Sequence, residues 1–193
     1  MKKIFQPGMF KQIMSMVASN AVGIFLCSVL YFICMFWSAD KPFWAAVMSG
    51  ILTLIYFSEI YQKAWACAER DNKSYTETTP YLFKGTVLSI GILVYYLIIW
   101  LLYIFTWNAL TIDGSIATWT GLIYNVIYVL STIMYTGFST PASGNVAWFV
   151  QLLIYIVPVI ASTLGYIAGE KGFMLTEKLI PFIYEKKKAE QKK

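Results

Sequence analysis

The sequence predicts an all-helical membrane protein: a bundle of four crossing helices, plus a fifth apolar helix that is re-entrant or lies on the outer surface. Two observations predict this class. The stretch from Gly85 to Gly169 holds one formal charge, Asp113, and a soluble domain could not hydrate its surface with so few charges. Charged residues make up 13% of the 193 residues, about half the share found in soluble domains. We expect residues 1–193 to form a single membrane domain.

The basic residues gather at the head of the chain, in the connector 69–84 and in the tail 170–193. Lysine and arginine next to apolar spans are typical of the cytoplasmic side. We therefore expect a multi-pass protein of the cell membrane, with its N- and C-termini in the cytoplasm. The basic tail is expected to contact anionic lipid. Nucleic acid is not an expected partner, because no folded basic face is available to present the charges.

The first elements are an interfacial N-terminal segment over 1–16 and a helical hairpin. Pro7 and Gly8 break the chain, and the apolar residues after them recur at helical spacing. The first crossing helix is expected over 17–37 and the second from Pro42 to about Glu69, with a short turn between them. Pro42 suits a first helical position, where its missing N–H would be unpaired anyway. Small residues spaced by four predict close helix packing, and they include Ser19, Gly23, Ala45 and Ser49.

Glu59 is the candidate ion-coupling residue. It follows Pro42 by about 25 Å of helix, which places it near the far boundary of a hydrocarbon core of about 30 Å. Two interpretations stay open. Glu59 can form an interfacial ion pair with Lys63, four residues on, or it can serve an ion or proton pathway inside the protein.

The connector 69–84 is the one strongly polar segment between the crossing helices. Asp71 and Asn72 predict a helix end there, and Pro80 restarts the chain. We expect Glu69, Arg70 and Asp71 to form local ion pairs at a solvated loop end; the alternative is a docking site for a cytoplasmic partner.

The third crossing helix is expected over 85–107, and two further apolar segments follow at 119–138 and 147–168. Five crossings would place the two lysine-rich ends on opposite sides, so we expect 119–138 not to cross. A further crossing formed by residues 5–18 would also give an even number, but its lysines argue against it. The extracytoplasmic or re-entrant region 108–146 is where we expect any cavity. Ala161, Gly165 and Gly169 form the best small-residue row, for packing within the chain or against another subunit.

Two sets of side chains are candidates for binding solutes. Polar groups in apolar surroundings are candidates for lining a cavity or pore: Asn20, Asn125, Gln151 and Asp113. Aromatic residues on the outer side are candidates for a pocket: Trp100, Tyr103, Trp107, Trp119, Tyr124 and Tyr128. The alternative for the aromatic set is an interfacial belt and core packing.

Several kinds of chemistry are not supported by the sequence. It contains no histidine, which excludes the usual zinc sites and a Ser-His-Asp triad. It contains no glycine-rich phosphate loop with Lys-Ser or Lys-Thr. We therefore expect no metal, no cofactor and no catalytic residue, and we do not expect an enzyme.

Parts of the chain resemble small multi-pass membrane proteins of Gram-positive bacteria. The resemblance lies in Glu69-Arg70-Asp71-Asn72 with the later Lys84-Gly85, and in Gly165-Tyr166-x-x-Gly169-x-Lys171-Gly172-Phe173 followed by Glu177-Lys178-Leu179. It covers less than a third of the chain. It implies a bacterial source and no particular mechanism.

These observations favour a subunit or substrate-binding component of a membrane transport system, because the chain is nearly all membrane-embedded and carries a polar connector. The alternatives are an oligomeric channel for ions or small solutes and a membrane assembly or regulatory protein. Each of these functions implies a homo-oligomer or a membrane or cytoplasmic partner subunit.

Overall fold

The computed structural model describes residues 6, 8–38, 42–73, 79–81, 83–110, 130–132, 135, 138 and 148–173. Its long elements are four helices: α1 (Met9–Ser38), α2 (Pro42–Asp71), α3 (Lys84–Leu110) and α5 (Trp148–Glu170). Each is long and apolar enough to cross a membrane. No strand occurs among the described residues. The predicted class, an all-helical membrane bundle, is confirmed.

The helix boundaries differ from the predicted ones chiefly at the head of the chain. The separate interfacial helix expected before residue 17 is absorbed into α1, which begins at Met9. Gly8, with a φ of 81°, is the residue that allows the turn before the helix. Beyond it nothing in the sequence interrupts the helical pattern. The predicted start of α2 at Pro42 is confirmed.

A glycine just after α5 explains why the helix ends where it does. Gly172 has a φ of 65°; its N–H donates to Gly169 O (3.1 Å), and the Phe173 N–H donates to Ala168 O (2.8 Å). This pair of hydrogen bonds is a Schellman motif, which satisfies the last carbonyls of the helix. The side-chain amide of Asn72, just after α2, donates hydrogen bonds to the carbonyl oxygens of Gly169 and Glu170. These bonds hold the ends of α2 and α5 together.

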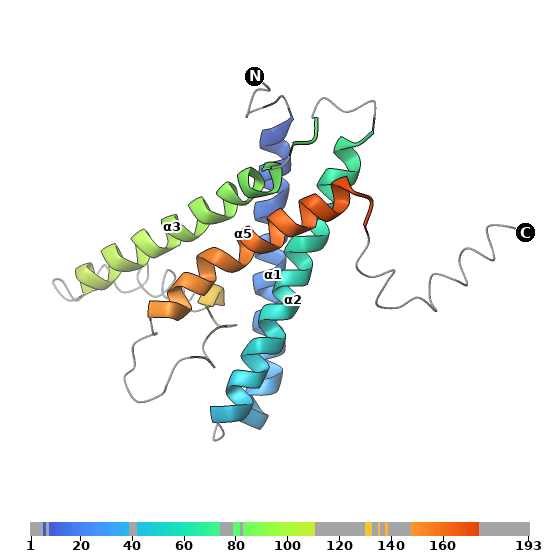
Figure 1. Ribbon diagram of the computed structural model, residues 1–193. Helices are drawn as coiled ribbons and strands as arrows, with labels where there is room; N and C mark the ends of the chain where they lie inside the picture. Colours follow the sequence, from blue (N-terminus) through green and yellow to red (C-terminus); the bar gives the residue numbers. More distant parts are fainter. Residues whose placement is uncertain are drawn as a thin grey trace, which may run out of the picture.

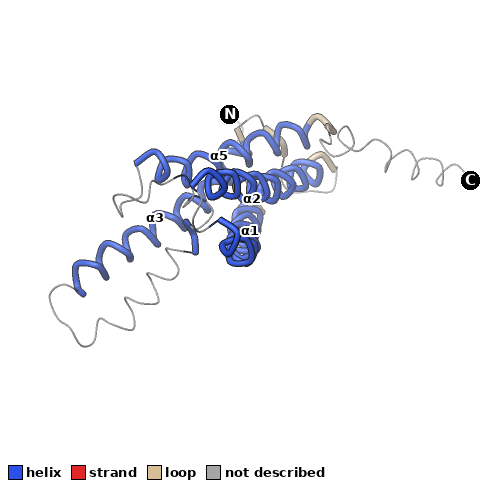
Figure 2. The backbone as a smooth tube through the Cα atoms, turned by 90° about the horizontal axis from the view of Figure 1, so that it is seen from below, coloured by secondary structure: helices blue, strands red, loops and turns tan. Residues whose placement is uncertain are grey.

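Figure 1 shows two pairs of helices that meet at one end and diverge toward the other. α1 and α2 form an antiparallel hairpin, while α3 and α5 cross this hairpin and extend away from it. The view from below shows that α5 runs along α2 and that α3 lies on the α1 side, both extending to the same side of the hairpin (Figure 2). α1 begins and α5 ends at the end where the helices meet, the arrangement that an even number of crossings requires.

The core runs between the two helix pairs and includes residues from the predicted non-crossing segment. Tyr135 is fully buried, and Leu130 and Phe138 pack against the same cluster. The Ser28 hydroxyl on α1 donates to Leu130 O at 3.5 Å. Whether 119–138 crosses the membrane lies outside the described residues, but its described parts lie inside the bundle.

Candidate functional site

Four side chains, one from each long helix, meet at the closed end of the bundle. The Asp71 carboxylate of α2 receives hydrogen bonds from Gln12 Nε2 of α1 (2.6 Å), Lys84 Nζ of α3 (2.6 Å) and the Tyr166 hydroxyl of α5 (2.8 Å). The side chains of Asp71 and Lys84 are both 0% exposed. We call Gln12, Asp71, Lys84 and Tyr166 the clasp. Because both charges are paired and hydrogen-bonded, the clasp can stay buried and fix the relative positions of the four helices.

The local sequence explains how the clasp forms. Asp71 is the last residue of α2 and Lys84 the first of α3, so the polar connector between them returns the chain to the same end. Gly85 lets α5 approach, because a Cβ there would lie 2.6 Å from Ser162 O. The Ser162 hydroxyl donates to Gly85 O at 2.6 Å. Close approach of this kind at small residues is typical of membrane helices.

The clasp corrects the interpretation of the connector. The sequence analysis expected Asp71 to pair locally, near Glu69 and Arg70, at a solvated loop end. Instead Asp71 is buried and pairs with Lys84 across the connector, while Glu69 and Arg70 are exposed. Burial, with a smaller contribution from the Asp71 carboxylate, raises the pKa of nearby Tyr81 above its usual value.

A second polar group lies deeper in the bundle, roughly 20 Å from the clasp along α2 and α3. The Tyr56 hydroxyl donates to Asn20 Oδ1 at 2.5 Å, and the Tyr96 hydroxyl lies 3.4 Å from both groups. Tyr135 lies within electrostatic range of Tyr56 and Tyr96. We call Asn20, Tyr56, Tyr96 and Tyr135 the tyrosine cluster. Its members come from α1, α2, α3 and the segment between α3 and α5.

The tyrosine cluster holds two polar atoms without a partner in the described part of the chain. Asn20 Nδ2 and the Tyr135 hydroxyl are both buried, and neither forms a hydrogen bond there. Asn20 and Tyr135 are each 0% exposed. Buried polar groups are normally satisfied, so an unsatisfied one calls for a water, an ion or a ligand.

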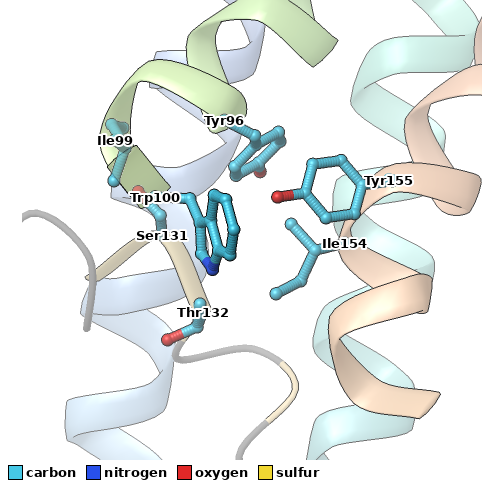
Figure 3. A pocket seen from close by; sticks show the side chains of 7 residues that line it. All are labelled: Tyr96, Ile99, Trp100, Ser131, Thr132, Ile154 and Tyr155. Atoms are coloured by element: carbon cyan, nitrogen blue, oxygen red, sulfur yellow. The ribbon is translucent and has the colours of Figure 1, made fainter. Parts of the chain in front are cut away.

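Two hollows lie near the tyrosine cluster: Tyr96 lines the smaller one, and the larger one shares Ser131 with it. A small one of about 20 Å³ is lined by Tyr96, Trp100, Tyr155 and neighbouring residues of the segment 130–132, and its side chains face one another across the gap between α3 and α5 (Figure 3). It has room for one water. A larger, more open groove of about 340 Å³ lies between α1, Tyr95 and the segment 130–131. Its polar groups include Ser28 and Ser131.

Glu59 lies away from these hollows. It lines a separate groove of about 350 Å³ on the α1/α2 hairpin, with Leu26 of α1 and Ser58 of α2 among its neighbours. Its Cγ lies 3.7 Å from the Cβ position of Gly23, close to the midpoint of α1. The expected pair with Lys63 is absent: among the described residues the ion pair that the structure shows is Lys84–Asp71.

The other predicted site residues divide into those described and those not. Trp100 lines the small hollow. The side chains of Tyr103, Trp107 and Gln151 lie outside the described residues although their backbones are helical, and Asp113, Trp119, Tyr124, Asn125 and Tyr128 lie outside altogether.

The predicted small residues pack within the chain. A Cβ on Gly165 would collide with the Tyr61 carbonyl, and one on Gly169 would lie 2.5 Å from Trp65 O. Ser19, Ser49 and Ala161 are buried, and Ala45 is half-buried. These contacts hold α5 against α2 through the closed half of the bundle.

The sequence analysis missed the clasp and the tyrosines. The lysine that stands immediately before the long uncharged stretch was no signal for a buried ion pair, because lysines at the ends of membrane helices ordinarily reach the interface. Nothing in the sequence marked Gln12, Tyr56, Tyr96 or Tyr166, which are separated by many residues and meet only in three dimensions. No group of three potential metal ligands occurs among the residues that the structure covers.

Comparisons of this chain with known protein families, with curated proteins and with solved structures found no match. The resemblance to small Gram-positive membrane proteins therefore stays a prediction. The structure by itself shows a helical membrane bundle with a clasp at one end and hollows further along it.

Proposed function

We propose that this chain is the membrane-embedded, substrate-binding subunit of a transport system, and that it binds a small amphipathic organic molecule beside the tyrosine cluster. The observation that carries the proposal is a pair of buried polar atoms with no partner among the described residues, Asn20 Nδ2 and the Tyr135 hydroxyl. A ligand that presents a hydrogen-bond acceptor to Asn20 would satisfy a group that is costly to leave unpaired.

The hollows support the same proposal. Binding sites for small molecules are mostly apolar, with a few polar groups that fix the orientation of the ligand. The larger groove is lined mainly by apolar residues of α1, together with Ser28, Tyr95 and Ser131. At about 340 Å³ it is at the lower end of the size range for ligand sites.

The tight packing at the closed end indicates the side from which a ligand would reach the hollows. The clasp and the glycine contacts of α5 pack the four helices tightly there. The helix pairs diverge away from that end (Figure 1), and the residues that line the hollows lie further along α1 and α3 from the clasp. With the lysine-rich ends in the cytoplasm, the hollows would open toward the outer half of the cell membrane. A molecule arriving from outside would reach the tyrosine cluster and be stopped by the clasp.

The test is a thermal-shift screen of the purified protein in nanodiscs against a panel of small amphipathic alcohols, amides and carboxylic acids. A true ligand should raise the melting temperature, since it binds the folded state and not the unfolded one. Tyr135→Phe should leave the stability without ligand unchanged or raise it, because it removes a buried hydroxyl that has no partner in the described structure, and it should abolish the shift. An equal shift in Tyr135→Phe would contradict this site.

A transport subunit also requires a partner. Native mass spectrometry after gentle extraction from the source membrane should show a stoichiometric foreign subunit. A homo-oligomer alone, together with solute flux through reconstituted vesicles, would favour the channel instead.

A further inference from the structure

The outward face of the α1/α2 hairpin carries a groove separate from the tyrosine cluster. Its lining consists of Leu26 from α1 and five residues of α2, Ile51, Leu54, Ile55, Ser58 and Glu59. Leu54, which forms part of this lining, is 70% exposed and projects from the rim of the groove. The hairpin face thus offers a hollow of about 350 Å³ and an apolar side chain that could fill the same hollow on another molecule.

Two charges on this face have no partner in the described structure. Glu59 and Lys63 form no hydrogen bond or ion pair with described residues, and both are only partly buried. Glu59 lies against Gly23, near the middle of α1. On either side of that point the outward residues of α1 are apolar, from Met14 to Ile33. Glu59 lines the open groove, and its carboxylate therefore lies at a depth where lipid offers no counter-charge.

A charge at this depth is expected to face protein or water, or to pair with another charge. Lipid tails can fill the groove, but they cannot supply a cation to Glu59. Lys63 is such a cation, and it lies on α2 one helical turn from Glu59, on the side toward Asp71. When two copies are related by a two-fold axis along the membrane normal, equal residues lie at equal depth. Glu59 of one copy then lies about 6 Å along the axis from Lys63 of the other, within reach of two long side chains.

From this charge complementarity we infer that the α1/α2 face is the interface of a homodimer. Glu59 and Lys63 of the two copies form reciprocal ion pairs, and Leu54 of each copy enters the groove of the other. The interface is isologous, because Leu54, the groove and both charges lie on one surface. It leaves the hollows on the α3 side free, so the dimer does not depend on the proposed transport function.

The test uses disulfide crosslinking of the full-length chain in native membranes. In a background with Cys27, Cys34 and Cys67 replaced, Leu54→Cys should crosslink between copies, since a disulfide requires Cα atoms within about 7 Å. Leu97→Cys, at an equally outward position on α3 with 48% exposure, is the matched control and should not crosslink. Equal crosslinking at the two positions would overturn the interface.

The charges are tested in the Leu54→Cys background. Glu59→Gln and Lys63→Gln should each lower the crosslinked fraction about five-fold, the equivalent of roughly 1 kcal/mol. The exchange Glu59→Lys with Lys63→Glu should restore it, because the reversed charges remain complementary across a two-fold axis. Helix content measured by circular dichroism checks that each variant is folded. Unchanged crosslinking in Glu59→Gln, or no recovery in the exchanged variant, would refute the ion pairs.

Discussion

Replacing Lys84 with methionine tests whether the clasp holds the bundle together. Methionine retains most of the length and apolar volume of lysine but removes the charge that faces Asp71. The Asp71 carboxylate would keep its hydrogen bonds from Gln12 and Tyr166. It would lose the cation at 2.6 Å while remaining buried.

The expected loss follows from the burial of the pair. An exposed ion pair contributes at most about 1 kcal/mol, but both side chains here are 0% exposed. Removing one partner of a buried pair leaves an uncompensated charge and typically costs about 3–5 kcal/mol. The double variant Asp71→Asn with Lys84→Met removes both charges, so its loss should be smaller than the sum of the two single losses. A double-mutant cycle isolates that coupling.

The assay is unfolding by sodium dodecyl sulfate in mixed micelles, followed by far-ultraviolet circular dichroism. Arg70→Gln is the control, because Arg70 is exposed and lies beside Asp71 in sequence; it should change the free energy of unfolding by less than about 0.5 kcal/mol. If Lys84→Met is no more destabilising than Arg70→Gln, the clasp does not stabilise the bundle and the reasoning fails.

Three further predictions concern packing, polar contacts and topology. Gly165→Ala should destabilise by about 1–3 kcal/mol because its Cβ meets a backbone carbonyl of α2, whereas Gly50→Ala, with nothing within 4 Å, should be neutral or stabilising; denaturant titration of both variants checks this. Tyr56→Phe removes a buried hydroxyl that donates at 2.5 Å and should cost about 1–2 kcal/mol in the same titration, so a loss near zero would count against that hydrogen bond. In a cysteine-free background, a thiol at 143 should be labelled from outside the cell and one at 190 should not; labelling at 190 would mean that residues 119–138 cross.

Much of the fold could be read from the chain because lipid imposes a simple rule. Every backbone polar group in the membrane must be satisfied within the protein, so long uncharged stretches become helices. This rule predicted all four long apolar helices. The start of α2 at Pro42 followed instead from the missing N–H of proline, and the four-residue spacing of small residues located positions such as Gly165 at which helices approach each other. The rule acts on stretches of about 20 residues, so it predicts the position of a helix more accurately than the residues at which the helix begins and ends. For example, α1 begins at Met9, earlier than predicted, because nothing after Gly8 interrupts the helical pattern.

The sequence by itself determined that the protein is a helical membrane bundle, where its four long apolar helices lie, and that its lysines gather at the two ends and in one connector. Only the tertiary structure decided which polar side chains meet. Asp71 seemed to belong to a solvated loop, yet it lies buried against Lys84, Gln12 and Tyr166. The physical reason is that periodicity describes one helix at a time. A hydrogen bond between residues 59 or 95 positions apart depends on how helices cross, and helix crossing is set by side-chain packing between elements.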